Sequence, residues 1–394
     1  MRDLDGRRIF FVGIGGAGMS AYAVLAHAWG AETAGWDRRE TPYLEHVRAA
    51  GIPVSISDEP EPSEGWEVVV SSAYGFPGKR RAELLAEFVS LRRSLVVAGS
   101  HGKTTTAGMI AFCLDRLGHD PAFVIGGEIP QLGGNARGGS GWLVVEGDES
   151  DRTIEALRPE IAVVTNVDFD HHTTFSSRAE LEALFERWLE RVPEVIRGDE
   201  LEPVEIELAL PGEHNRRNAA CALGALELLD VPRQDAAPVL REFTGVGRRF
   251  ERRGEAGGVT VYDEYAHHPT ELAAALSAAR DMAGQGRILA AFQPHLYSRT
   301  RHFAREFASA LAAADAACVT DVYAAREAPV PGVTGKLVTD ALAEVRPGMP
   351  IGWTPGLEDA ALFLSHRVVP GDLVLTAGAG DVDRVGTRLL ELVR

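Results

Sequence analysis

Short apolar runs alternate with longer stretches of helical periodicity over almost the whole chain. The strands that these runs predict lie at residues 8–13, 32–36, 66–70, 95–98, 141–145, 161–165, 259–262, 287–292, 317–320 and 372–375. Helices are predicted between them, including residues 21–29, 104–117, 215–229 and 271–280. Because alternating strands and helices are typical of doubly wound sheets, the pattern predicts an α/β fold with mostly parallel sheets.

The pattern of strands and helices starts afresh twice, near Ser94 and again after Gly245. A chain of 394 residues exceeds one ordinary domain and is long enough for two or three units, each with its own core. We therefore predict three domains, at residues 1–93, 94–245 and 246–394.

Composition and charge limit the kinds of binding partner that the protein is expected to have. The formal net charge is −17, and a nucleic-acid-binding protein needs a basic face, so no nucleic-acid partner is expected. No apolar run approaches the roughly 18 residues that span a bilayer, and no basic-then-apolar leader opens the chain. The three cysteines form neither a metal spacing nor an even disulfide set. These features predict a cytoplasmic protein with no membrane partner.

The most informative motif is L-V-V-A-G-S-H-G-K-T-T-T at residues 95–106, an apolar strand that runs into a glycine loop and a helix. Backbone N–H groups of such a loop can surround a polyphosphate, while Lys103 reaches its terminal oxygens and Thr104 offers a hydroxyl to a magnesium ion. The loop G-x-x-G-K-T is shorter than the usual G-x-x-x-x-G-K-[ST]. A glycine turn with an incidental lysine is the structural alternative.

A second glycine loop precedes the first predicted helix. Gly13, Gly15 and Gly18 fit G-x-G-x-x-G after a strand, and Asp37 ends the next strand. This pattern is typical of dinucleotide-binding dehydrogenases, but the same geometry holds any pyrophosphate, including that of a nucleotide sugar. A tight turn without a ligand is the structural alternative.

Acidic groups follow two of the predicted buried strands. The stretch E-G-D-E-S-D at residues 146–151 could hold magnesium on the phosphates, with Glu146 nearest the strand. A solvated acidic loop remains an alternative for Glu149 and Asp151. In T-N-V-D-F-D-H-H, one of His171 and His172 could complete a second metal site.

Further polar motifs follow predicted strands or precede predicted helices. They are P-G-E-H-N-R-R-N (211–218), G-V-G-R-R-F-E (245–251), Y-D-E-Y-A-H-H-P-T-E-L (262–272), F-Q-P-H-L-Y-S-R-T (292–300) and G-A-G-D (378–381). Ligands bind at this edge of open α/β sheets, so a shared cleft is expected, although each motif alone could be a well-capped loop.

Taken in order, these motifs resemble those of the Mur ligases. The matching segments are G-I-G-G-A-G-M-S, G-S-H-G-K-T-T-T, E-G-D-E-S-D, T-N-V-D-F-D-H, P-G-E-H-N-R-R-N, G-R-R-F-E, A-H-H-P-T-E, F-Q-P-H-L-Y-S-R-T and A-P-V-P-G. The resemblance runs from about Arg8 to about Asp381, and the shortened phosphate loop is also a feature of that family.

The resemblance implies three domains: a Rossmann-like N-terminal domain for a UDP sugar, a central P-loop ATPase domain with a mostly parallel sheet, and a Rossmann-like C-terminal ligase domain. It implies an ATP-dependent ligase that adds L-alanine to the carboxylate of UDP-N-acetylmuramate through an acyl phosphate, in peptidoglycan precursor synthesis. Mg²⁺ would be required, and the C-terminal domain would close over ATP. We expect a monomer or a homodimer.

Carried over residue by residue, the resemblance implies the ATP site. Its phosphate loop comprises Gly99, Ser100, His101, Gly102, Lys103, Thr104 and Thr105. Asn218 would contact adenine, Asp263 the ribose and Arg249 the γ-phosphate. Thr104 and Glu146 would hold the first magnesium ion and His171 the second. Lys103, Glu146, His171 and Arg249 are therefore the expected catalytic residues.

The same resemblance implies the substrate contacts. These are Gly15, Gly16, Ala17, Gly18, Ser71, Asn135, Arg137, His267, His295 and Arg299.

The chain also departs from the pattern of the family. Gly147 stands where alanine is usual, Ala266 where glycine is usual, and Leu296 where arginine is usual. Only 40 positions separate His171 from Pro211, and residues 195–210 look like a compressed replacement of a longer stretch. Alternatives are therefore a related ligase with another amine, such as a recycled tripeptide, or a nucleotide-binding protein that has lost ligation. A dehydrogenase would require NAD, which we do not expect to bind.

Overall fold

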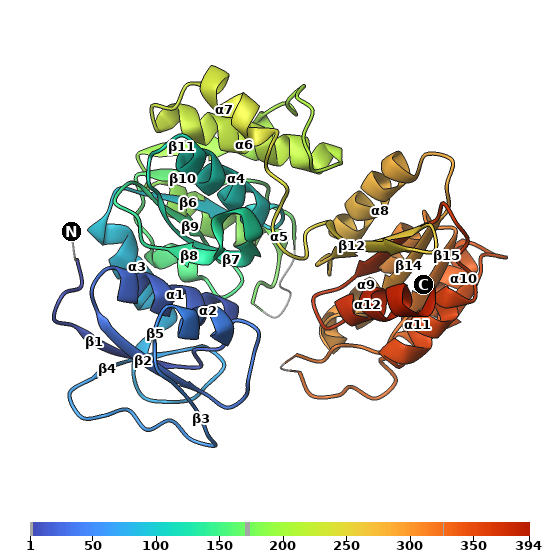
Figure 1. Cartoon of the computed structure of the whole chain (residues 1–394), viewed down its shortest axis with the longest axis horizontal. Helices are drawn as coiled ribbons and strands as arrows, with labels where there is room; N and C mark the ends of the chain where they lie inside the picture. The colour runs from blue at the N-terminus through green and yellow to red at the C-terminus, as the bar shows by residue number, and fades with distance from the viewer. Residues whose placement is uncertain (1–2, 170–173, 326) are drawn as a thin grey trace. The chain divides into compact units, whose positions relative to one another are not determined.

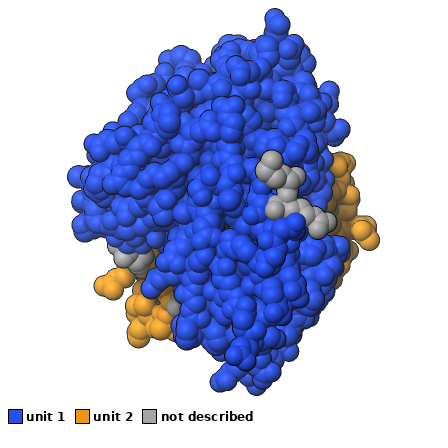
Figure 2. Space-filling view, turned by 90° about the vertical axis from the view of Figure 1, so that its left-hand side faces the viewer, with its two compact units in different colours: residues 1–209, 215–246 blue, residues 210–214, 247–394 orange. Residues whose placement is uncertain are grey.

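The computed structural model describes residues 3–169, 174–325 and 327–394. The chain forms two compact units, which Figure 2 shows in blue and orange. The first unit comprises Met1–Ala209 and Asn215–Val246, and the second comprises Leu210–His214 and Gly247–Arg394.

The first sheet of the first unit is parallel and has the strand order β3-β2-β1-β4-β5 (Figure 1). Its strands are β1 (Arg8–Val12), β2 (Glu32–Asp37), β3 (Val54–Ile56), β4 (Glu67–Val70) and β5 (Lys79–Arg80). Its helices are α1 (Ala17–Ala28), α2 (Leu44–Ala49) and α3 (Arg81–Leu91). The predicted strands at residues 8–13, 32–36 and 66–70 are confirmed to within a residue at each end.

The second sheet has the strand order β11-β10-β6-β9-β7-β8. Its strands are β6 (Ser94–Ala98), β7 (Ala122–Ile129), β8 (Gly134–Arg137), β9 (Leu143–Glu146), β10 (Ile161–Val164) and β11 (Glu194–Arg197). The helices are α4 (Lys103–Arg116), α5 (Arg178–Leu189), α6 (Glu213–Leu228) and α7 (Arg233–Leu240). Because β6 lies between β10 and β9, all five of its residues are buried. The antiparallel hairpin β7–β8 is not predicted by the sequence pattern.

These two sheets share one hydrophobic core. Helix α1 contacts β7 and β8 of the second sheet, and the buried cluster runs from Leu25 and Phe88 to Val124 and Val145. Because the two sheets share this core, the residues that follow the strands of the first sheet are held in a fixed position relative to those that follow the strands of the second.

The second unit has a six-stranded sheet with the order β12-β13-β17-β14-β15-β16. Its strands are β12 (Glu251–Ala256), β13 (Val259–Glu264), β14 (Ile288–Phe292), β15 (Ala316–Val319), β16 (Ile351–Trp353) and β17 (Leu373–Ala377). Helices α8 (Pro269–Ala283), α9 (Tyr297–Leu311) and α10 (Lys336–Val345) share one core with the sheet, and α11 (Leu357–Ser365) and α12 (Asp383–Leu392) share another.

Strands β13, β17 and β14 are parallel neighbours, so their carboxyl ends meet at one edge of this sheet. The motifs Y-D-E-Y, G-A-G-D and F-Q-P-H follow or end these strands. Strand β12 pairs antiparallel with β13 and is not predicted by the sequence pattern. None of the helices in the described part of the chain is long and apolar enough to cross a membrane.

Candidate active site

The loop at residues 99–102 joins the buried strand β6 to helix α4, as the sequence predicts. Gly99 has φ of +128° and Gly102 has φ of +81°, which favour glycine. A Cβ on Gly99 would lie 2.3 Å from Thr165 Oγ1, and one on Gly102 would lie 2.3 Å from Asn218 Oδ1. Both glycines are therefore required by conformation and by space, and Asn218 lies directly against the start of α4.

The segment after β10 holds this loop in place. The N–H of His101 donates to Asn166 Oδ1 at 2.9 Å, and Thr165 Oγ1 donates to His101 O at 2.6 Å. The N–H of Asp168 donates to Ser100 Oγ at 2.9 Å. The sequence predicts only a metal-binding histidine in this segment. The structure shows that Thr165, Asn166 and Asp168 shape the phosphate loop. Their position at the end of the strand next to β6 is the signal that could have indicated this.

Lys103 is held by the loop and by a buried acid. Its Nζ donates to Gly99 O at 2.6 Å and to Glu149 Oε1 at 2.9 Å. Burial disfavours the ammonium charge, but the carboxylates of Glu149, Asp148 and Glu146 outweigh that cost and raise the pKa of Lys103. Glu149 is fully buried, so the alternative of a solvated acidic loop is wrong for this residue.

Thr104 and Glu146 form the oxygen pair that the sequence predicts for magnesium. Thr104 Oγ1 donates to Glu146 Oε1 at 2.9 Å, and the N–H of Gly126 donates to Glu146 Oε2 at 2.6 Å. Hydroxyl and carboxylate oxygens suit Mg²⁺, which takes its other ligands from phosphate and water. Within the described part of the chain, no group of three His, Cys, Asp or Glu side chains is placed to hold a metal ion. His171 lies outside the described residues, as do the rest of residues 170–173.

The rest of the acidic loop binds an arginine that sequence reasoning missed. Arg81 Nη2 donates to Asp148 Oδ2 at 2.8 Å and to Asp151 Oδ2 at 2.6 Å. Partial burial would raise the pKa of Asp148, but Arg81 and Lys103 outweigh it and lower the pKa to about 2. A Cβ on Gly147 would lie 2.8 Å from Val96 Cγ1, so the family's usual alanine would have to displace β6 side chains.

The first glycine loop is held by Asp37. The N–H of Gly15 donates to Asp37 Oδ2 at 2.8 Å, and Tyr74 OH donates to Asp37 Oδ1 at 3.0 Å. Asp37 is buried. In a dehydrogenase the acid at this position would bind a ribose, whereas here Asp37 holds the glycine loop in place. Ser71 follows β4 beside the loop, since a Cβ on Gly13 would lie 2.9 Å from Ser71 Cβ.

Two predicted substrate contacts come from strand β8 and have different surroundings. Asn135 Nδ2 donates to Ala17 O at 3.0 Å, so this residue reaches the start of α1. Arg137 instead pairs with Asp115 at 2.7 Å, near the carboxyl end of α4. The structure therefore places Asn135, and not Arg137, at the first glycine loop.

A cavity of about 320 Å³ lies beside this loop in the first unit. Trp36, Arg38, Tyr74 and Phe76 are among the residues that line it. Trp36 and Tyr74 pack edge to face with ring centroids 5.2 Å apart. The cavity thus combines aromatic faces with a guanidinium and the acidic residues Asp58 and Glu59, a lining that suits a planar polar ring.

In the second unit, Arg248 anchors the turn that presents Arg249. Arg248 Nε donates to Asp263 Oδ2 at 2.9 Å, and its two other nitrogens donate to Gly380 O at 2.7 Å and Gly378 O at 2.9 Å. The φ angles of Arg248 and Phe250 are +60° and +51°, which is strained for residues other than glycine. Sequence reasoning named Arg249 but missed the anchoring role of its neighbour.

Asp263 and Glu264 end strand β13 as buried acids. Asp263 is fully buried, with Oδ2 on Arg248 and Oδ1 accepting from Thr376 Oγ1 at 2.7 Å. The predicted ribose contact is therefore, in this structure, a partner of Arg248. Burial raises the pKa of Glu264 to about 7, although Arg249 opposes that shift.

The predicted substrate residues His267, His295 and Arg299 meet at one place in the second unit. The rings of His267 and His295 lie edge to face with centroids 5.8 Å apart, and Arg299 Nη1 is 3.2 Å from His295 Nδ1. The ring of Tyr323 stacks on His295 with centroids 6.0 Å apart. Leu296, where arginine is usual, has φ of +69° and precedes α9.

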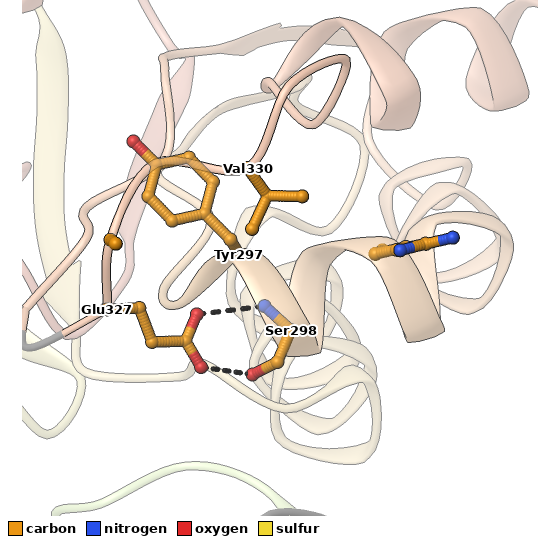
Figure 3. A pocket seen from close by; sticks show the side chains of 6 residues that line it. Tyr297, Ser298, Glu327 and Val330 are labelled. Atoms are coloured by element: carbon orange, nitrogen blue, oxygen red, sulfur yellow. Dashed lines mark hydrogen bonds between the residues drawn. The ribbon is translucent and has the colours of Figure 1, made fainter.

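A loop after β15 packs against the start of α9 (Figure 3). The carboxylate of Glu327 accepts from the N–H of Ser298 at 2.9 Å and from the Ser298 hydroxyl. Tyr297, Arg301 and Val330 are among the residues that line a cavity of about 360 Å³ there. The motif A-P-V-P-G at residues 328–332 follows Glu327, so this carboxylate holds the motif to the helix.

Three segments of the chain match the sequence models of three domains that belong to one protein family. Residues 8–93 match the Mur ligase family, catalytic domain; residues 97–200 match the Mur ligase middle domain; residues 248–380 match the Mur ligase, glutamate ligase domain. The matched segments together cover more than half of the chain.

Named relatives and solved structures agree with these matches. A UDP-N-acetylmuramate--L-alanine ligase of Streptomyces avermitilis is 38% identical, covering 98% of this chain and 97% of the relative. One of Rubrobacter xylanophilus is also 38% identical, with 97% and 99% covered. The structure of UDP-N-acetylmuramate-alanine ligase MurC from Thermotoga maritima superposes with a TM-score of 0.82 and 26% identity, covering 98% of each chain. A murein peptide ligase from Psychrobacter arcticus shares the fold, with a TM-score of 0.67 and 22% identity over 98% of this chain and 99% of its own.

The alignment with the Streptomyces avermitilis relative extends over 455 positions, more than the 394 residues of this chain. That relative therefore carries residues that have no counterpart here. The three matching segments, the identity over nearly the full length and the three sheets of the fold agree: the chain belongs to the Mur ligase family.

Proposed function

We propose that the protein is an ATP-dependent ligase that adds L-alanine to the carboxylate of UDP-N-acetylmuramate in peptidoglycan precursor synthesis. The observation that carries the proposal is the loop after β6, where Lys103 meets Glu149 and Thr104 meets Glu146. The relatives named UDP-N-acetylmuramate--L-alanine ligase support the choice of substrates. Such a reaction consumes cytoplasmic metabolites, so the proposal includes a cytoplasmic location.

The chemistry divides into two substitutions. ATP supplies a phosphoryl group that turns the substrate carboxylate into an acyl phosphate, and the amino group of L-alanine then displaces phosphate to form the amide. The protein has to hold the phosphates, align the carboxylate with the γ-phosphorus and exclude water. The phosphate loop, with its backbone N–H groups and Lys103, is suited to the first task.

We assign Thr104 and Glu146 to a magnesium ion that neutralises charge on the β- and γ-phosphates. Their oxygens already lie 2.9 Å apart at the start of α4, and Gly126 fixes the second Glu146 oxygen. Lys103 complements them, since its raised pKa keeps it charged at neutral pH. His171 remains the predicted ligand of the second ion.

We assign the sugar nucleotide to the first glycine loop. Gly15 and Gly16 precede helix α1, and Ala17 and Gly18 begin it. The first N–H groups of this helix favour a diphosphate, and Ser71 and Asn135 lie beside the loop. The aromatic cavity next to this loop is of a size and character that suit the nucleoside.

We assign the remaining roles to residues of the second unit and to Asn218 on α6. Arg249 would contact the γ-phosphate and Asn218 the adenine, whereas Asp263, which is fully buried against Arg248 and Thr376, is not assigned to the ribose. His267, His295 and Arg299 would contact the amine substrate or the acyl phosphate. The cluster of two imidazoles and a guanidinium supports that assignment, because those groups suit a carboxylate and a leaving phosphate.

A phosphate-release assay tests the proposal. The protein is mixed with ATP, Mg²⁺, UDP-N-acetylmuramate and one amine at a time. Release with L-alanine, and not with the tripeptide L-Ala-γ-D-Glu-meso-diaminopimelate, is expected. Release only with the tripeptide or with another amine would show that L-alanine is not the amine substrate. No release despite ATP binding would indicate that ligation has been lost.

A further inference from the structure

A cavity of about 360 Å³ lies between the start of α9 and the loop after β15, and none of the roles assigned above uses it. Its walls are formed by Tyr297, Ser298, Arg301, Glu327, Ala328 and Val330 (Figure 3). Helix α9 and the loop follow β14 and β15, which are parallel neighbours in the sheet of the second unit. Because ligands of open α/β sheets bind beyond the carboxyl ends of the strands, the cavity lies where a substrate is expected.

The cavity presents one cation and one anion. Arg301 is exposed, and its guanidinium forms no ion pair or hydrogen bond with any other residue that the structure describes. The carboxylate of Glu327 accepts from the N–H of Ser298 at 2.9 Å and from the Ser298 hydroxyl, and no cation among the described residues pairs with it. Both charges are therefore available to a bound molecule.

Glu327 is fixed although it belongs to a loop. Ser298 is the second residue of α9, so its N–H has no acceptor within the helix. Glu327 supplies that acceptor, and its own N–H donates to Ala324 O at 2.9 Å. The carboxylate is thus held at the cavity before a ligand arrives, which lowers the entropy cost of binding.

The remaining lining indicates the class of ligand. The ring of Tyr297 and the aliphatic side chains of Ala328 and Val330 provide apolar contacts. A guanidinium binds a carboxylate, a carboxylate attracts an ammonium group, and apolar contacts suit a small aliphatic side chain. These features together match a zwitterionic α-amino acid such as L-alanine, whereas the Glu327 carboxylate would repel a phosphate.

Two short segments connect the cavity to the imidazole cluster of the second unit. Tyr297 follows His295 by two residues. The ring of Tyr323 stacks on His295, and Glu327 follows Tyr323 by four residues. Arg301 lies on the same face of α9 as Tyr297, because side chains four positions apart are neighbours on a helix. An amino acid in the cavity would therefore be adjacent to the cluster that is suited to the acyl phosphate.

Resting on the function proposed above, we propose that this cavity is the subsite for the amino-acid substrate and that Arg301 binds the α-carboxylate of L-alanine. Tyr297, Ala328 and Val330 then surround the methyl group, and Glu327 attracts the ammonium group. Arg301 accordingly selects amines that carry a free carboxylate on the carbon that bears the amino group. The L-alanyl amine of the tripeptide L-Ala-γ-D-Glu-meso-diaminopimelate has an amide at that position, so the subsite favours L-alanine over it.

Helix α9 offers a matched control one turn further on. Arg305 belongs to the same helix, but it does not line the cavity, and it pairs with Glu344 at 3.8 Å. Its side chain is 77% exposed. Arg305→Gln therefore removes the same charge from the same helix without touching the proposed subsite.

The experiment measures the initial rate of phosphate release by the full chain as L-alanine is varied, with ATP, Mg²⁺ and UDP-N-acetylmuramate saturating. Arg301→Gln is expected to raise KM for L-alanine by about tenfold or more, the effect of losing one charge-assisted hydrogen bond. KM for ATP and for UDP-N-acetylmuramate should stay within about twofold, because the lost contact is made to the amino acid alone. Arg305→Gln should leave all three KM values within about twofold.

L-Alaninamide, which lacks the carboxylate, distinguishes loss of carboxylate binding from a change in the helix. Wild type should use it with a lower kcat/KM than L-alanine. Arg301→Gln should lower kcat/KM for L-alanine by about tenfold, but for L-alaninamide by no more than about twofold. If neither protein turns over L-alaninamide, KM for L-alanine decides.

Three results would overturn the proposal: an unchanged KM for L-alanine in Arg301→Gln, an equal rise in Arg305→Gln, or an equal loss of kcat/KM for L-alanine and L-alaninamide. Thermal unfolding checks that each variant is folded. Should Arg301→Gln not fold, Arg301→Met, which keeps the aliphatic stem, takes its place with the same expected results.

Failure of the subsite and failure of the proposed function give different results. A wild-type protein that releases no phosphate with L-alanine would contradict the proposed function itself. Turnover of L-alanine by wild type, with an unchanged KM in the Arg301 variant, would contradict only the subsite.

Discussion

Glu264 at the end of β13 makes the stability of the second unit depend on pH. Glu264 is 8% exposed, and its Oε2 accepts from the N–H of Phe250 at 2.9 Å. Arg249 lies 3.8 Å from Oε1 and favours the charged form, whereas Glu271 and Asp263 oppose it. Burial is the largest effect and raises the pKa from 4.5 to about 7. The perturbation is Glu264→Gln, which keeps the shape and an acceptor for Phe250.

The sign of the effect follows from proton binding. Between pH 4.5 and about 7 the folded protein holds a proton on Glu264 that the unfolded chain has released. Stability contributed by this group is therefore fully present below pH 4.5 and is lost as the pH rises to about 7. A pKa shift of this size corresponds to about 3 kcal/mol in the free energy of unfolding.

Hydrogen exchange of peptides that cover β13 measures the opening of the second unit. The stability of wild type relative to Glu264→Gln should fall by about 2–3 kcal/mol between pH 5 and pH 8. Comparing the two proteins at the same pH removes the intrinsic pH dependence of exchange. A difference between wild type and variant that is the same at both pH values would refute the assignment of the raised pKa to Glu264.

Three further substitutions test the site. Lys103→Ala should abolish phosphate release while circular dichroism shows an intact fold; substantial turnover would contradict its role at the phosphates. Gly102→Ala places a Cβ 2.3 Å from Asn218 Oδ1 at φ of +81°, so AMP-PNP binding should be lost and the free energy of unfolding should fall by at least about 1–2 kcal/mol; unchanged calorimetric binding would show that the loop relaxes freely. Arg248→Ala leaves the fully buried Asp263 without its cation and should lower the free energy of unfolding by about 3 kcal/mol, measured by denaturant titration; a loss below about 1 kcal/mol would mean that Asp263 becomes neutral at little cost.

The phosphate loop could be predicted from the sequence because its determinants are contiguous. An apolar strand, two glycines and a helix with threonines specify β6, residues 99–102 and α4 locally, and α4 begins one residue before the predicted start. The parallel sheets follow from the alternation of strands and helices. The strand β12, in contrast, reads E-R-R-G-E-A and has no apolar alternation, since it lies at the edge of its sheet.

The partners of the charged side chains could not be predicted in the same way. Arg81 reaches Asp148 and Asp151 across 67 and 70 positions of sequence, through the core that the first two sheets share. Nothing in the local pattern distinguishes Glu149, which is fully buried on Lys103, from a solvated acid in the same loop. Such pairings depend on the packing of one sheet against another, which periodicity does not encode.

The central claim is that the substrate carboxylate takes the γ-phosphoryl group of ATP. Isotope transfer tests it most directly: UDP-N-acetylmuramate labelled with ¹⁸O in its carboxylate is turned over with ATP, Mg²⁺ and L-alanine in unlabelled water, and the released phosphate is analysed by mass spectrometry. Our account predicts one ¹⁸O atom in each phosphate released, because the carboxylate oxygen leaves with the phosphoryl group. Phosphate without ¹⁸O, formed while the amide product accumulates, would contradict it.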